Sequence, residues 1–188
     1  MDEHDGGTVV ALRELQGVLP VSPRVSWSRR SLKLMGLLVV AWYVMTLTHE
    51  LGHVVCGWLS GGKLVYLDLR PWALPQSMFD PDPNPLARLW GGPILGAVIP
   101  CSIALATRRV WVRFIGSFCV LANGTYLTIA WCVGDSFLDT TKLLEHGASP
   151  IALAVYCVVC CGYGYVAFRR ACREVLFAAP LFAASAKG

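Results

Sequence analysis

The chain has 188 residues and a net charge of +4, and 55% of its residues are hydrophobic whereas only 15% are charged. This composition is typical of an integral membrane protein, and it excludes an ordinary soluble domain and a disordered chain. The sequence has no glycine-rich phosphate loop and no interleaving of basic and aromatic residues. We therefore expect the lipid bilayer, and no nucleic acid, to be the partner of its basic residues.

Four long apolar stretches follow one another along the chain, and each can cross about 30 Å of hydrocarbon. They cover residues 34–60, 89–107, 114–134 and 147–168. We predict an all-α polytopic membrane protein with about four transmembrane helices. The predicted parts are a polar N-terminal segment, a four-helix transmembrane domain, and a basic, amphipathic C-terminal tail, over residues 1–33, 34–168 and 169–188.

Basic residues gather before the first stretch, between the second and third, and after the fourth. These three groups are Arg24, Arg29, Arg30 and Lys33; Arg108, Arg109 and Arg113; and Arg169, Arg170 and Arg173. Four spans place all three groups on one side of the membrane, and the positive-inside rule assigns that side to the cytoplasm. We therefore predict a multi-pass protein with both termini in the cytoplasm, and with residues 61–88 and 135–146 on the opposite side.

The first stretch contains the sequence His-Glu-Leu-Gly-His at residues 49–53. An ionisable residue at bilayer depth is costly, so its presence there indicates function. On a helix His49 and His53 lie about 40° apart around the axis, so both imidazoles can bind one Zn²⁺ ion. Glu50 is placed to take a proton from a water molecule on that ion. The alternatives are a haem or other ligand pair, and a buried hydrogen-bonded pair.

A glycine pair at residues 61–62 follows the first stretch and precedes an alternation of apolar and polar residues over 63–70. The alternation predicts a short β-hairpin-like or re-entrant segment. Its edge is able to pair with an unwound substrate segment, or it is a simple surface hairpin. In the second stretch, Gly92, Pro93 and Gly96 predict close packing against the helix that carries the histidines.

A single carboxamide, Asn123, lies in the third stretch. In a lipid-embedded helix such a group needs a partner, which is either a neighbouring helix or the backbone of a bound substrate. We include Asn123 as a candidate substrate-binding residue and keep helix packing as its alternative. Most of the eight cysteines lie inside the apolar stretches. They are more typical of small apolar fillers than of a disulfide framework.

A catalytic zinc ion needs three protein ligands, so a third must come from elsewhere in the chain. The candidates after the third stretch are Asp135, Asp139, Glu145 and His146. Asp135 directly follows the apolar run and is our choice. Asp139, one helical turn further along, is the second candidate.

Taken together, these features resemble the site-2 protease class of intramembrane zinc metalloproteases. The resemblance spans roughly residues 34–146 and depends on the 49–53 motif in an apolar helix, the glycine break and strand, Gly92-Pro93 and a later aspartate. It implies that His49, His53 and Asp135 bind Zn²⁺ and that Glu50 activates water. In that class the aspartate is followed by glycine, whereas here Ser136 follows Asp135.

From the motif and the resemblance we expect a zinc metalloendopeptidase that hydrolyses peptide bonds of membrane-protein substrates within or near the bilayer. Two other functions stay open from the sequence. One is a catalytically inactive, protease-like scaffold that binds membrane helices. The other is a zinc transporter, since histidine pairs also occur on transporter helices, although a transporter usually shows an internal repeat.

Overall fold

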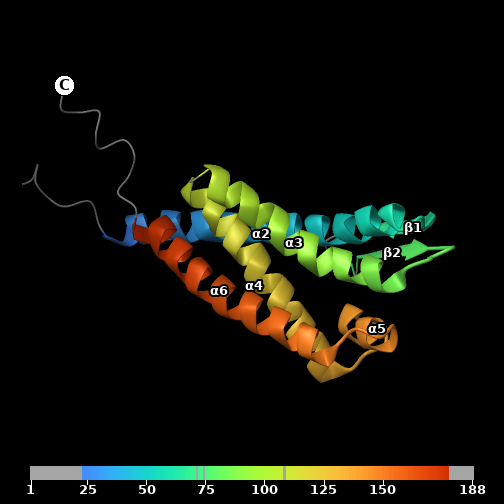
Figure 1. Ribbon diagram of the computed structural model, residues 1–188. Coiled ribbons are helices and arrows are strands. Elements are labelled where there is room, and N and C mark those ends of the chain that lie inside the picture. Colours follow the sequence, from blue (N-terminus) through green and yellow to red (C-terminus); the bar gives the residue numbers. More distant parts are fainter. Residues whose placement is uncertain (1–22, 71, 74, 108, 178–188) are drawn as a thin grey trace, which may run out of the picture.

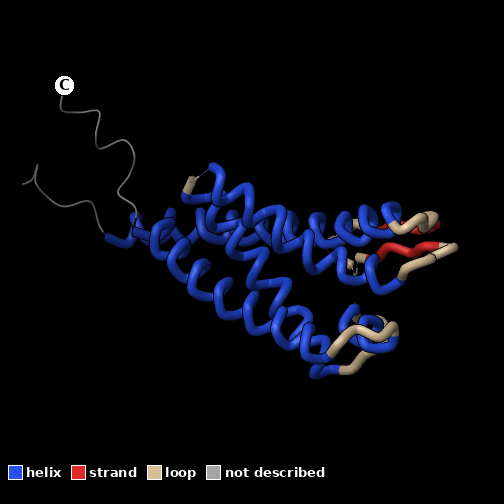
Figure 2. Tube along the Cα trace, viewed as in Figure 1, coloured by secondary structure: helices blue, strands red, loops and turns tan. Residues whose placement is uncertain are grey.

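The computed structural model describes residues 23–70, 72–73, 75–107 and 109–177, and most of them are helical (Figures 1 and 2). In chain order the elements are α2 (Pro23–Leu59), β1 (Leu64–Asp68), β2 (Gln76–Phe79), α3 (Pro85–Thr107), α4 (Val110–Val133), α5 (Asp139–Glu145) and α6 (Pro150–Phe177). The predicted N-terminal segment lies outside the described residues up to position 22, and the predicted C-terminal tail lies outside them from position 178.

Within the described ranges, α2, α3, α4 and α6 are long and apolar enough to cross a membrane. The prediction of a helical fold with four such helices is therefore confirmed in its coarse form. Helix α2 begins at Pro23 and α6 continues to Phe177, so both helices extend beyond the apolar stretches. Residues 33 and 168 thus lie inside helices. Long basic side chains can remain solvated at the end of a helix, so a change in composition there does not end it.

Helix α4 lies at the centre of the bundle and packs against α2, α3 and α6, while α2 also packs against α3. The hairpin and α5 lie at one end of the bundle, and the start of α2 and the end of α6 lie at the other (Figure 1). A core cluster between α2, α4 and α6 includes Phe114 and Ala171. A second cluster, near α5, includes Leu89, Leu127 and Leu143.

The predicted strand after the glycine pair is confirmed as β1, which pairs with β2 in an antiparallel hairpin. Gly61 has a φ of 82°, a conformation that favours glycine and lets the chain turn out of α2. The ring of Phe79 lies against Gly57, where an added Cβ would come within 2.6 Å of Phe79 Cε1. The guanidinium carbon of Arg88 lies 5.9 Å from the centre of the same ring. The hairpin is therefore docked on the end of α2 and the start of α3.

Helices α2 and α3 approach each other backbone to backbone, as the small residues of the second stretch predicted. A Cβ added at Gly52 would lie 2.9 Å from the carbonyl carbon of Gly91 and 2.9 Å from the Cα of Gly92. Both are rigid backbone atoms, so only a glycine fits at Gly52 without moving a helix. The contact lies within the 49–53 motif and fixes the distance of the histidines from α3.

We expect Gly52→Ala to lower the free energy of unfolding by about 1–3 kcal/mol, the usual cost of overpacking a tight contact. Gly36→Ala, on the same helix, is the matched control, because an added Cβ there meets nothing within 4 Å. It should raise stability by about 0.5–1 kcal/mol, since alanine restricts the unfolded chain more than glycine does. Thermal unfolding of both variants in detergent measures the difference, and equal shifts would contradict the packing described here.

Candidate metal centre

Three potential ligand atoms converge between α2 and α5. The Nε2 atoms of His49 and His53 lie 3.1 Å apart. The Oδ2 atom of Asp139 lies 2.9 Å from the first of them and 3.4 Å from the second. Both imidazoles are buried, with 6% of His49 and 3% of His53 exposed. The prediction that the two histidines share one face of a helix is therefore confirmed.

The spacing of the three atoms suits a single small cation. Zinc binds histidine nitrogen and carboxylate oxygen at about 2.0–2.2 Å, so ligand atoms at two corners of a tetrahedron lie roughly 3.3–3.5 Å apart. The distances between the Nε2 atoms of His49 and His53 and Oδ2 of Asp139 range from 2.9 to 3.4 Å. Movements of a few tenths of an ångström would bring all three atoms to the distances that zinc requires.

Outer hydrogen bonds set the protonation of both imidazoles. The Nδ1–H of His53 donates to the backbone carbonyl of Arg88 at 2.9 Å, and a carbonyl can only accept. The Nδ1–H of His49 donates to Oδ1 of Asn123 at 2.7 Å. The amide NH₂ of Asn123 donates to the carbonyl of Cys119 at 2.8 Å, which turns the amide oxygen toward His49. Each neutral imidazole therefore directs its Nε2 lone pair toward Asp139.

The consequence is a cluster of acceptors without a donor. Two imidazole lone pairs and a carboxylate oxygen face one another, and one proton placed between any two of them leaves the third contact unsatisfied. A metal ion satisfies all three at once. Histidine ligands commonly donate their other ring nitrogen to a carbonyl or carboxamide oxygen, as both do here. By this test the residues His49, His53 and Asp139 fit a zinc ion.

Asp139 is presented by α5, which is held firmly against the bundle. The Oγ1 hydroxyl of Thr140 donates to the carbonyl of Leu127 in α4 at 2.9 Å. The side chain of Leu143 is fully buried among core residues of the neighbouring helices.

The structure does not place Asp135, the choice of third ligand from the sequence, beside the two histidines. Asp135 is exposed, and its Oδ1 accepts a hydrogen bond from the backbone N–H of Phe137 at 2.9 Å. Gly134 ends α4 with a φ of 69°, and the turn that follows keeps Asp135 at the surface. The chain then continues into α5, which packs against the bundle and places its first residue, Asp139, beside the histidines. The structure brings Asp139, the second candidate, to that position.

Glu50 is buried beside the histidines, with 6% of the residue exposed. The ligand atoms of His49, Glu50 and His53 all lie within 4.8 Å of one another. Among the described residues, neither Oε2 of Glu50 nor Oγ of Ser77 in β2 has a hydrogen-bond partner, although both atoms are buried. A buried carboxylate oxygen without a partner is costly. The Glu50 carboxylate lies next to the three converging atoms, a position that suits a general acid–base.

Asn123 is fully buried, and its oxygen and nitrogen bond to His49 and Cys119. These contacts favour the packing alternative over contact with a substrate, because both polar groups of the amide are already used within the protein. Asn123 thus acts on the site by orienting His49. The sequence indicated that this carboxamide needs a partner. It did not indicate which one, because 74 positions separate Asn123 from His49 in the chain.

Two contributors to the site, the Arg88 carbonyl and Tyr126, were missed in the sequence, and a third, Gly92, was expected only to pack the two helices together. The carbonyl of Arg88 orients His53, and a backbone atom leaves no signal in the side-chain pattern. A Cβ on Gly92 would lie 2.7 Å from Cδ2 of His53, so this glycine makes room for the imidazole. The ring of Tyr126 lies 5.5 Å from that of His49, edge to face. Tyr126 follows Asn123 by three positions, a spacing that places both on one helical face.

Comparisons with protein-family models, with curated proteins and with solved structures found no match to this chain.

Proposed function

We propose that this chain is a zinc-dependent endopeptidase of the site-2 protease kind, which cleaves membrane-protein segments within or near the bilayer. One observation carries the proposal. Three lone-pair atoms of His49, His53 and Asp139 converge without a donor, and an unpartnered carboxylate oxygen of Glu50 lies beside them. Three ligands and an adjacent carboxylate are the parts of a hydrolytic zinc centre.

Each residue has a separate role in this proposal. His49, His53 and Asp139 hold the ion, and Asn123 and the Arg88 carbonyl fix the two imidazoles. When bound, zinc supplies Lewis acidity, which polarises a peptide carbonyl and lets a water molecule ionise at near-neutral pH. Glu50 accepts the proton that water loses and delivers it to the nitrogen of the departing amine. The peptide must be locally unwound, because intrahelical hydrogen bonds occupy the carbonyls of a membrane helix.

The proposal includes an orientation in the membrane. Helices α2, α3, α4 and α6 have the length and composition of membrane spans. The start of α2 and the end of α6, with their basic residues, lie at one end of the bundle, and the hairpin and α5 lie at the other (Figure 1). By the positive-inside rule both termini are cytoplasmic and the metal centre is nearer the opposite face.

Zinc content and peptide hydrolysis test the proposal together. We expect protein purified in detergent to hold one zinc ion per chain. The protein is then reconstituted in liposomes with single-span peptides that carry a fluorophore and a quencher, and that have glycine or proline at different depths. Cleavage should disappear on chelation and return with added zinc. Freshly purified, folded protein without zinc would contradict the proposal and favour a protease-like scaffold. Zinc uptake into dye-loaded liposomes would favour a transporter.

A further inference from the structure

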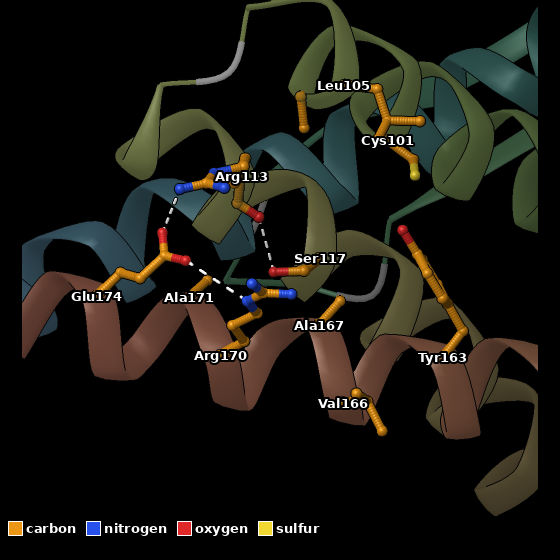
Figure 3. A pocket seen from close by; sticks show the side chains of 11 residues that line it. Cys101, Leu105, Arg113, Ser117, Tyr163, Val166, Ala167, Arg170, Ala171 and Glu174 are labelled. Carbon is orange, nitrogen blue, oxygen red and sulfur yellow. Dashed lines mark hydrogen bonds and ion pairs between the residues drawn. The ribbon is translucent and has the colours of Figure 1, made fainter.

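A second feature lies at the opposite end of the bundle from the metal centre. An open cavity of about 360 Å³ lies between α3, α4 and α6, within the size range of small-molecule pockets, about 300–1,000 Å³ (Figure 3). Part of its wall is apolar and includes Ala104, Leu105 and Val166. Its charged side chains come from Arg113, Arg170 and Glu174. Neither the proposed peptidase mechanism nor the metal centre uses any of these residues.

The charged side chains gather at one end of the cavity (Figure 3). The guanidinium of Arg113 pairs with one carboxylate oxygen of Glu174, and Nε of Arg170 lies 3.8 Å from the other. Two positive groups and one negative group leave a net charge of +1. Among the described residues, the Nε–H of Arg113 is buried and has no hydrogen-bond acceptor. The cluster therefore has both an excess positive charge and an unused donor, which suit an anion.

The apolar wall continues onto the outer surface of the helices. Leu105 is 65% exposed and Val166 is 66% exposed, although both line the cavity. In a membrane these side chains face acyl chains, and Arg113 and Arg170 lie close to the ends of α4 and α6, at the depth of the headgroups. The cavity therefore joins lipid-facing apolar surface to a cationic cluster on the basic side of the bundle.

We propose that this cavity binds one anionic phospholipid. Its phosphate lies against Arg113 and Arg170, and one acyl chain follows the apolar wall between α3 and α6. Basic pockets between transmembrane helices on the cytoplasmic side are suited to anionic headgroups. A free phosphate ion would use the arginines alone and would leave the apolar wall uncovered, so the lipid matches more of the surface. This inference depends on the helices crossing a bilayer and is independent of the metal centre.

Arg170→Gln and Arg169→Gln form a matched pair of test variants. Both residues are exposed and adjacent in α6, but only Arg170 lines the cavity. Native mass spectrometry of the full chain in detergent measures the binding of phosphatidylglycerol and, separately, of phosphatidylcholine. We expect one phosphatidylglycerol per chain and at least tenfold weaker binding of phosphatidylcholine. Arg170→Gln should weaken phosphatidylglycerol binding by about tenfold or more, as loss of a charged hydrogen bond does. Arg169→Gln should leave it unchanged.

A second variant, Ala167→Phe, tests the apolar part without changing charge, because Ala167 lines the cavity and a phenyl ring would fill it. It should also weaken phosphatidylglycerol binding, and circular dichroism checks that each variant is folded. Equal losses in Arg170→Gln and Arg169→Gln would overturn the proposal, since they would indicate attraction by overall charge. Equal binding of phosphatidylcholine would also overturn it. Displacement of the lipid by millimolar inorganic phosphate would instead assign the cluster to a free anion.

Discussion

Glu50→Gln is expected to leave the zinc content at one ion per chain and to lower peptide hydrolysis by about 10²–10⁴-fold, the usual contribution of a general acid–base. Glutamine has nearly the same size as glutamate but cannot accept a proton at neutral pH. The three converging ligand atoms belong to His49, His53 and Asp139, and none belongs to Glu50, so the ion should stay bound. Zinc analysis and cleavage of the fluorogenic single-span peptide in liposomes measure the two quantities on the same preparation.

The control for this variant is Glu145→Gln, which removes an exposed carboxylate at the end of α5. Both zinc content and turnover should match those of the unmodified protein. Undiminished turnover in zinc-loaded Glu50→Gln would rule out the proposed proton transfer. Loss of zinc from Glu50→Gln would show instead that Glu50 is itself a ligand, and the role of Asp139 would then need to be reassigned.

The second large effect is expected from Asp139→Asn, which should weaken zinc binding by more than about 100-fold. Substitution of a residue that merely orients a ligand typically costs 10–100-fold in metal affinity, and loss of a charged ligand should cost more. Asp135→Asn is the matched control, because it makes the same chemical change four positions away at an exposed site. Competition with a zinc chelator in detergent gives the affinity of both variants.

The opposite pattern, with zinc retained by Asp139→Asn and lost from Asp135→Asn, would refute the ligand set described here. His49→Ala serves as the positive control for zinc loss, since its Nε2 contacts the other two ligand atoms. Circular dichroism separates loss of metal from loss of fold. Asn in place of Asp139 keeps the size of the side chain, so the packing of Thr140 and Leu143 should hold α5 in place.

The sequence was sufficient to predict the relative positions of the site residues that lie on a single helix. The relative positions of His49, Glu50 and His53 follow from helical geometry, which is the same in every α-helix. The third ligand depends on the turn after α4 and on the way α5 packs. In that turn the carboxylate of Asp135 caps the N–H of Phe137. The position of Asp135 directly after an apolar stretch therefore did not indicate whether it lies near the two histidines.

The fold shows the same division between local and distant information. Long apolar stretches predict membrane-length helices, and a glycine pair followed by alternation predicts a strand such as β1, because both are properties of neighbouring residues. The partner strand β2 has no comparable alternation in its four residues, Gln76–Phe79. The hydrogen bond between Asn123 and His49 joins residues 74 positions apart. Only the packed arrangement of α2 and α4 determines such a pair.

Arg88 connects the hairpin to the metal centre through two different parts of one residue. Its carbonyl accepts from His53, whereas its guanidinium bonds to Asp82 at 2.7 Å and lies over the ring of Phe79. The docking of the hairpin and the orientation of the His53 imidazole are thus thermodynamically linked. Such linkage is reciprocal. Under the proposed function, any free energy that the docked hairpin contributes to holding a metal ion would be returned equally by the bound ion, which would keep the hairpin docked.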